Sequence, residues 1–465
     1  MNRSYETFGE YLSRWMEENG YDAVSLSLLT GKTSAPTIAR LMRDQLGYQR
    51  CAQFITELSD AIESIDESVL KKMRTCVEIN RYGKAMYTAQ KNLMHILKGE
   101  AAVSATEIIE KRLADEIITW AGGRKISVLA LALTQAYSMR AIKIVCNTVT
   151  DCEITQLIEE GHADQLFAIL SGGLPLAFRN DYQLHSISNA SGFLVRNTLI
   201  IKREDGRQLL ALIHDEKEHI LEITSENNLY DFCMSLIRVD NPSSYRIYRL
   251  IRRDYPEEYI SFMNSCIDHE KDKAIYHLKC DVGLEYMPAE IPLKNFAEWA
   301  EKNDPRFVPY VEELGSLLKK RLENIAKKTE PTYLLMTCSG MLEFARTGVM
   351  SDHPFCLNPF TPEDRKKIIL HLISLAQTAP QFVPLLIKDK NFRSEYSFIG
   401  YGGGKLLVCK AEADYSFSDY TEIIIDSQPL FDQYASFFTG ILVKNHALGK
   451  KASIQFLKSL EAEIK

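Results

Sequence analysis

One glycine-rich stretch has the composition of a phosphate-binding loop. Residues 400–405 read GYGGGK, and a glycine loop that ends in lysine can cradle phosphate oxygens. That chemistry also requires a serine or threonine after the lysine and a helix whose first amides point at the ligand. Here the apolar sequence LLVC follows, which predicts a strand. We therefore interpret residues 400–405 as the turn of a β-hairpin.

Two further stretches combine histidine with metal-binding or nucleophilic groups. In HDEKEH, the histidines at 214 and 219 lie five residues apart, not the four of a zinc-binding helix, so a solvated turn is the better interpretation. Cys338, Ser339 and His353 are nucleophile and base types, but no G-x-S-x-G turn surrounds them. The sequence thus predicts no catalytic residue, no enzymatic activity, no cofactor and no metal site.

The ten cysteines are scattered and form no C-x-x-C pair. Structural zinc requires close ligand pairs, so reduced thiols of a cytoplasmic protein are the expectation. The first residues, MNRSYETFGEYLSRW, lack the apolar core of a signal peptide. The longest apolar run, residues 126–133, is too short to span a membrane. We expect a cytoplasmic protein with no membrane partner.

Length and composition indicate an ordinary globular protein of several domains. The chain has 465 residues, of which 46% are hydrophobic and 25% charged, and its net charge is −7. This balance excludes a disordered chain and a protein coated in basic surface, although it permits one local basic face.

Positive charge is concentrated between residues 31 and 50, a segment that contains four cationic residues and one acidic residue, Asp44. The segment after Ser34 has helical spacing: Ile38, Leu41 and Met42 share one side, while Arg40 and Arg43 lie on the other. Hydroxyl groups flank the cationic side. Such a face can enter the major groove of DNA, where arginine bonds to guanine edges or phosphates.

Short helices surround this face. Amphipathic spacing predicts helices over residues 6–19, 23–30 and 48–60, and a further helix that begins after the cap at Ser34. Gly31 permits the left-handed turn between the second and third helices. This arrangement is a helix-turn-helix pattern.

These residues resemble the XRE-type family of phage-repressor-like (lambda-repressor-like) regulators. The matching positions are Leu26, Gly31, Ser34 at the cap and Ile38 as the buried anchor. The resemblance covers residues 1–62 and implies that positions such as Arg40 reach bases while Ser34 meets phosphate. With their flanks, the expected DNA-binding residues are Lys32, Thr33, Ser34, Ala35, Pro36, Thr37, Arg40 and Arg43.

The resemblance implies a bacterial DNA-binding transcription regulator whose partner is double-stranded DNA, bound as a homodimer. The C-terminal region is then expected to sense an unidentified effector, bind a protein partner or oligomerise. A second interpretation is a protein-interaction scaffold whose helix-turn-helix no longer binds DNA. The apolar Ala35–Pro36 pair and the net acidic first sixty residues favour this alternative.

The predicted fold class is α+β multidomain. We expect an all-α helix-turn-helix domain (residues 1–62), a helical connector (63–103) and two α/β domains (104–255 and 256–465). The connector has heptad-like spacing from Ile79 to Ile96, compatible with a coiled-coil dimer or with a helix packed on its own chain.

The C-terminal region contains two similar segments. Hairpins are predicted over 192–214 and 395–413, each followed by a strand and then a helix that opens near Leu229 or Leu430. An internal duplication and a chance similarity both explain this pattern. Residues 244–259, SYRIYRLIRRDYPEEY, interleave tyrosine with arginine; we expect a helix with an aromatic inner face, with binding of an acidic ligand or nucleic acid as the alternative. The helix after it is expected to run from 257 to 277.

Overall fold

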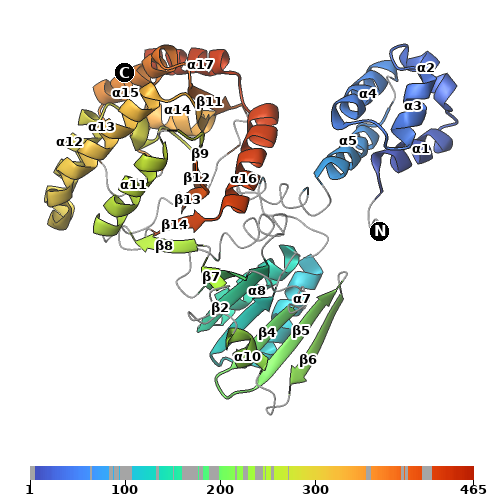
Figure 1. The fold of residues 1–465 in the computed structure, drawn as a ribbon, viewed down its shortest axis with the longest axis horizontal. Coiled ribbons are helices and arrows are strands. Elements are labelled where there is room, and N and C mark those ends of the chain that lie inside the picture. Colours follow the sequence, from blue (N-terminus) through green and yellow to red (C-terminus); the bar gives the residue numbers. More distant parts are fainter. Residues whose placement is uncertain are drawn as a thin grey trace. The chain divides into compact units, whose positions relative to one another are not determined.

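The computed structural model divides the chain into two compact units, Met1–Lys91 and Asn92–Lys465. Figure 1 shows the helices and strands of both units, coloured along the sequence. The structure describes residues 6–62, 65–82, 87, 94, 107–131, 136–149, 151–159, 176, 182–187, 198–214, 217–223, 229–235, 244–246, 248–252, 256–270, 272–351, 358–388, 392, 396–410 and 421–464.

The described part of the N-terminal unit is all helical. Its elements are α1 (Phe8–Glu18), α2 (Ala23–Thr30), α3 (Ala35–Met42), α4 (Tyr48–Ala61) and α5 (Glu67–Tyr82). Capping boxes at Thr7 and Asp22 start α1 and α2, and Gly31 ends α2 at a φ of 61°. Apolar side chains from these helices meet in one core. The four helices predicted for residues 6–60 are confirmed.

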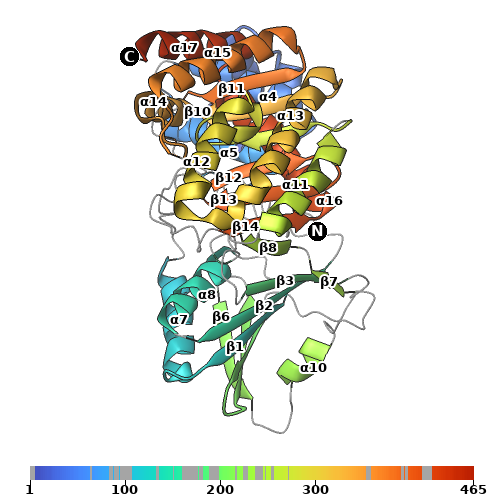
Figure 2. The same cartoon turned by 90° about the vertical axis from the view of Figure 1, so that its left-hand side faces the viewer.

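The first sheet has the strand order β6-β5-β4-β1-β2-β3-β7. Strands β1, β2 and β3 are parallel, while β4, β5 and β6 extend the sheet from β1 as an antiparallel series. Helices α7 and α8 pack against each other, and α10 packs on β4; Figure 2 shows α7 and α8 together beside this sheet. The bounds are α7 (Glu107–Ala121), β1 (Ile126–Leu131), α8 (Ala136–Thr148), β2 (Cys152–Glu159), β3 (Tyr182–Ile187), β4 (Thr198–Arg203), β5 (Gln208–His214), β6 (Lys217–Ile223), α10 (Leu229–Ser235) and β7 (Ser244–Arg246).

The second sheet has the order β11-β10-β9-β12-β13-β14-β8. Strands β9, β10 and β11 are parallel, and β12, β13, β14 and β8 continue antiparallel from β9. The strand bounds are β8 (Tyr248–Arg252), β9 (Ile275–Leu278), β10 (Thr332–Thr337), β11 (Phe382–Ile387), β12 (Tyr396–Tyr401), β13 (Lys405–Lys410) and β14 (Thr421–Asp426).

Helices cover this sheet through two apolar clusters. Residues of α11 and α13 pack on β12, β13 and β14, whereas α14, α15 and α17 pack around β10 and β11. The helical bounds are α11 (Pro256–Glu270), the 3-10 helix η1 (Leu284–Tyr286), α12 (Glu290–Asn303), the 3-10 helix η2 (Pro305–Tyr310), α13 (Val311–Lys327), α14 (Cys338–Thr347), α15 (Pro362–Thr378), α16 (Gln428–Phe437), the π-helix η4 (Phe438–His446) and α17 (Lys450–Glu463).

The two sheets share one strand plan over six strands each. In both, three parallel strands are followed along the chain by three antiparallel strands, and the first antiparallel strand pairs with the first parallel strand. Strands β1 to β6 therefore correspond in order and direction to β9 to β14. The seventh strand breaks the likeness, since β7 joins β3 whereas β8 joins β14.

Two helix predictions are wrong. Residues 244–246 and 248–252 form the short strands β7 and β8, not a helix with an aromatic face. The tyrosines and arginines there recur every three residues, which fits a helix better than a strand, but pairing with β3 and β14 decides in favour of strands. The helix predicted for 257–277 ends at Glu270, and β9 begins at Ile275, because pairing with β10 and β12 holds these residues in the sheet.

Both hairpins are confirmed where they are described. β4 and β5 turn at Gly206, with φ of 87°, and β12 and β13 turn through Gly403 and Gly404, at 99° and 85°. The GYGGGK sequence is thus a hairpin turn. Most of the connector after residue 82, the tip of HDEKEH and His353 lie outside the described residues. No described helix has both the length and the apolar character needed to cross a membrane.

Candidate functional site

The structure distributes the predicted N-terminal site residues over the turn before α3 and α3 itself. Lys32 is exposed and pairs with Asp60 at 3.5 Å. Ser34 is the N-cap residue of α3, and its Oγ lies 2.9 Å from Oγ1 of Thr37. Ala35 and Pro36 form the first turn, and Arg40 and Arg43 are exposed at the other end of the helix.

Thr33 is buried, which corrects its expected place on an accessible flank. Its hydroxyl donates to the carboxylate of Glu57 and accepts from Arg50, both on α4. Glu57 also accepts from Gln53 at 2.8 Å. Because these bonds fasten the start of α3 to α4, Thr33 serves the packing of the N-terminal unit rather than its surface.

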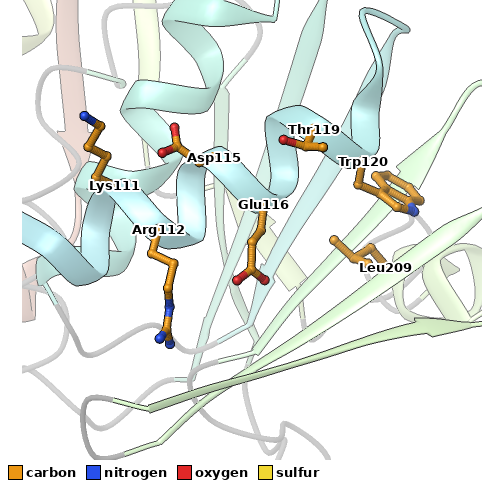
Figure 3. A pocket seen from close by; sticks show the side chains of 7 residues that line it. All are labelled: Lys111, Arg112, Asp115, Glu116, Thr119, Trp120 and Leu209. Carbon is orange, nitrogen blue, oxygen red and sulfur yellow. The ribbon is translucent and has the colours of Figure 1, made fainter.

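A groove of about 720 Å³ follows α7 in the first sheet's half of the C-terminal unit. Figure 3 shows its lining side chains on α7, with Leu209 of β5 at one end. Lys111, Arg112, Asp115 and Glu116 are exposed on the helix surface. The charges of these four side chains sum to zero, and the side chains are solvated. The four side chains are therefore not desolvated, as side chains with strongly shifted pKa values at functional sites are. It is lined by Lys111, Arg112, Asp115, Glu116, Thr119, Trp120 and Leu209.

The second sheet contains a different kind of cluster, built of ionisable groups in the protein interior. His277 lies in β9 and Lys279 follows its last residue, so both side chains point to the same face of the sheet. Glu285 comes from η1, Glu270 from the end of α11 and Arg321 from α13. Their exposed fractions lie between 1% and 7%. We call these five residues the β9 cluster.

Ion pairs connect the charged members of the β9 cluster. Lys279 Nζ lies 3.2 Å from Glu285 Oε2. Arg321 holds Glu270 through Nε at 2.8 Å and Nη2 at 2.6 Å, and its Nη1 lies 3.8 Å from Glu285 Oε1. Arg321 also donates to the phenol of Tyr401. Two cations and two carboxylates thus balance in a region from which water is excluded.

His277 is held from one side only. A hydrogen bond of 2.6 Å joins its Nδ1 to the hydroxyl of Tyr286, and the rings of Tyr286 and Tyr401 meet its ring edge to face. Nε2 is buried and has no hydrogen-bond partner among the described residues. When Nδ1 carries the proton, Nε2 is a free basic nitrogen. This arrangement fixes the ring and leaves one buried nitrogen without a partner among the described residues.

Burial and charge shift the pKa values in the cluster in defined directions. Burial, reinforced by Lys279 and Arg321, lowers the pKa of His277 well below its ordinary value, so the imidazole is neutral. Burial alone would raise the pKa of Glu285, but Lys279 and Arg321 overcome it and hold this carboxyl ionised. Burial also opposes the charge of Arg321, yet Glu270 and Tyr401 keep its pKa well above the usual range.

The β9 cluster has no counterpart in the first sheet. Strands β1 and β9 can be aligned by their first residues, because these pair with the first residues of β2 and β10. In this alignment Val128 corresponds to His277 and Ala130 corresponds to Lys279. Apolar side chains thus occupy both positions in β1. At these two described positions, only the second sheet carries ionisable groups.

Sequence reasoning missed this cluster because it placed residues 275–277 in a helix. The available signal was His277 and Lys279 two residues apart at the end of an apolar run, a spacing that puts both on one face of a strand. Glu270 and Arg321, 51 positions apart, could not be paired from the sequence. Cys338 and Ser339 begin α14, where Ser339 Oγ donates to the Phe392 carbonyl at 3.1 Å.

Comparison with known proteins finds similar solved structures but no matching family model. No family model matches the chain, and no curated protein matches it. Among solved structures, phosphatidylserine synthase of Haemophilus influenzae Rd KW20 has a TM-score of 0.25 and 10% identity over 76% of this chain and 91% of its own. Polyphosphate kinase of Porphyromonas gingivalis has a TM-score of 0.25 and 11% identity over 76% of this chain; the match spans about half, 54%, of the kinase.

These findings contradict the interpretation as an XRE-type regulator. No model of that family matches residues 1–62 or any other part of the chain. The predictions of transcription regulation, of double-stranded DNA and a homodimer as partners, and of no enzymatic activity are wrong. A TM-score of 0.25 is too low to define the chemistry of this chain, which rests on its own residues.

Proposed function

We propose that the C-terminal unit is an enzyme that cleaves or transfers phosphate esters, with Nε2 of His277 as the nucleophile. One observation carries this proposal: a buried, neutral imidazole has one nitrogen fixed by Tyr286 and the other without a partner among the described residues, beside two buried cations. Strongly perturbed ionisable groups of this kind gather at functional sites. Imidazole is a nucleophile only when neutral, and burial keeps His277 in that form.

The charges of the cluster balance in this structure, so an anionic substrate has to replace Glu285 or Glu270 as the partner of a cation. Lys279 and Arg321 supply the positive charge that neutralises phosphate oxygens as a transferred group changes partners. In the first step, Nε2 forms a bond to phosphorus while the bond to the leaving oxygen breaks. Water or an acceptor hydroxyl then displaces the histidine. The cluster is closed in this structure, so the reaction requires opening of the cover formed by α11 and α13.

The test is hydrolysis of two chromogenic esters, p-nitrophenyl phosphate and bis(p-nitrophenyl) phosphate, by the full-length protein. We expect His277→Asn to lower turnover by about 100-fold or more. His371→Asn is the matched control, because His371 of α15 also has a buried Nε2 without a partner among the described residues. Turnover that is absent in the wild type, or equal in wild type and His277→Asn, overturns the proposal.

A second readout separates nucleophilic catalysis from a structural role. Rapid quenching at alkaline pH with a ³²P-labelled ester should trap an acid-labile phosphohistidine on the peptide that contains His277. The label should be absent from His277→Asn and present in His371→Asn. A label on another residue would contradict the assignment of the nucleophile.

We also retain the four-part division at residues 62, 103 and 255 as a proposal, together with an internal duplication of the two α/β parts. The shared order and direction of β1–β6 and β9–β14 support it. A cytoplasmic location is likewise proposed; its support is that the nine described cysteines form no disulfide with one another.

A further inference from the structure

Two cysteine sulfurs lie against each other where α8 ends and β2 begins. Cys146 is in the last turn of α8 and Cys152 is the first residue of β2. Their Sγ atoms are 3.5 Å apart, and the exposed fractions of the side chains are 4% and 1%. No residue of the β9 cluster belongs to these elements, so the pair is independent of the proposed activity.

The separation of the two sulfurs is that of atoms in contact but not bonded. A disulfide requires about 2.05 Å, so each sulfur would move by less than about 1 Å. Rotation about single side-chain bonds in a chain segment of six positions can supply that movement. The backbone around the pair is anchored, because Ile126 of β1 donates to the Asp151 carbonyl at 3.1 Å and Val149 donates to Val145 at 2.7 Å.

Residues next to both cysteines reach solvent although the thiols do not. Asn147, Thr148 and Asp151 are exposed. A small reagent therefore reaches the thiols only after local opening at the end of α8.

We propose that Cys146 and Cys152 form a reversible disulfide by exchange with a small oxidised thiol of the glutathione disulfide class. One cysteine loses its proton, and its thiolate attacks glutathione disulfide, forming a mixed disulfide and releasing one glutathione. The thiolate of the second cysteine then attacks the protein sulfur and releases the second glutathione. Two electrons pass from the cysteines to glutathione, and a bond from the end of α8 to the start of β2 results.

The experiment equilibrates the reduced full-length protein with glutathione disulfide under native conditions and counts free thiols. Of the ten cysteines, eight should remain titratable. The intact mass should fall by two hydrogen atoms, and a non-reducing peptide map should join Cys146 to Cys152. Excess reductant should restore all ten thiols. Exchange should be faster at higher pH because the thiolate is the nucleophile.

Three variants make the test specific. Cys146→Ser and Cys152→Ser should each abolish the loss of mass, whereas Cys233→Ser, which removes another buried thiol from α10, should leave it unchanged. Oxidation should raise the melting temperature of the wild type and Cys233→Ser only. The proposal is overturned if wild type keeps ten thiols while urea-unfolded protein is oxidised in parallel, or if both single variants still lose two hydrogens.

Discussion

Arg321 of α13 and Glu270 of α11 form a two-point ion pair in the interior of the second sheet's half of the C-terminal unit. The guanidinium Nε and Nη2 lie 2.8 and 2.6 Å from Oε1 of Glu270, and the two side chains are 1% and 2% exposed. Formation of such a pair costs desolvation free energy, because both charges leave water. Removal of one partner destabilises the fold further, because the other charge then remains buried without a counterion.

We therefore expect Arg321→Ala to lower the free energy of unfolding by about 3–5 kcal/mol. The change leaves the carboxylates of Glu270 and Glu285 without the buried cation that both contact. Urea denaturation followed by circular dichroism measures it. Arg306→Ala is the control, because Arg306 pairs with Asp304 while 67% exposed and should matter far less. Equal losses in both variants would contradict the cost assigned to burial.

Tyr286→Phe should act on His277 rather than on the fold. It removes the hydroxyl that lies 2.6 Å from Nδ1 while the ring that packs on Phe382 remains. If His277 is the nucleophile, kcat should fall by about 10-fold or more, with KM nearly unchanged, because ring orientation matters most in the transition state. The steady-state kinetics of both esters measure this split. A change confined to KM would show that Tyr286 binds substrate instead of positioning His277.

The stability of the protein should fall as pH is lowered from about 6.5 toward about 5. Burial lowers the pKa of His277, so the unfolded chain takes up a proton in this range that the folded protein does not. The unfolded state is then favoured by up to about 1.4 kcal/mol per pH unit for one such group. His371 has a pKa shifted in the same direction by burial, whereas Glu285, with its lowered pKa, loses its contribution only at more acid pH.

Urea denaturation at several pH values checks this expectation. The slope of unfolding free energy against pH should decrease in His277→Asn, and by a smaller amount in His371→Asn, which is only half-buried. A slope that His277→Asn leaves unchanged would mean that this imidazole titrates normally in the folded protein. The acid limb of ester hydrolysis should, for the same reason, lie below pH 6.5.

Glu57→Ala should destabilise the N-terminal unit by about 1–3 kcal/mol. Glu57 is 5% exposed, and its loss leaves Thr33, Arg50 and Gln53 without their shared acceptor. Thermal denaturation of the full chain measures the shift. Asp60 is on the same helix as Glu57, but its carboxylate is exposed where it pairs with Lys32. Asp60→Ala should therefore change stability little. A larger loss for Asp60→Ala than for Glu57→Ala would contradict the buried network.

Local signals in the sequence determined most of the helices and both hairpins. The helices of residues 6–60 follow from caps at Thr7 and Asp22, from Gly31 and from apolar spacing, all of which act within a few residues. The hairpin turns follow from glycines that adopt positive φ. Residues 244–252 and 275–278 were misassigned because short segments acquire strand structure from partners far along the chain.

By itself the sequence thus determined where chain segments turn, which faces are apolar and that the protein is a mixed α/β chain. It also pointed to the surface of α3 as the site, because exposed arginines are visible in a helical wheel. Only the tertiary structure decided which charges are desolvated. Glu270, His277, Lys279, Glu285 and Arg321 come from four elements, and only the folding of α11, η1 and α13 against β9 brings them together. The reactivity of an ionisable group depends on its burial and its neighbours, and neither is a property of its position in the chain.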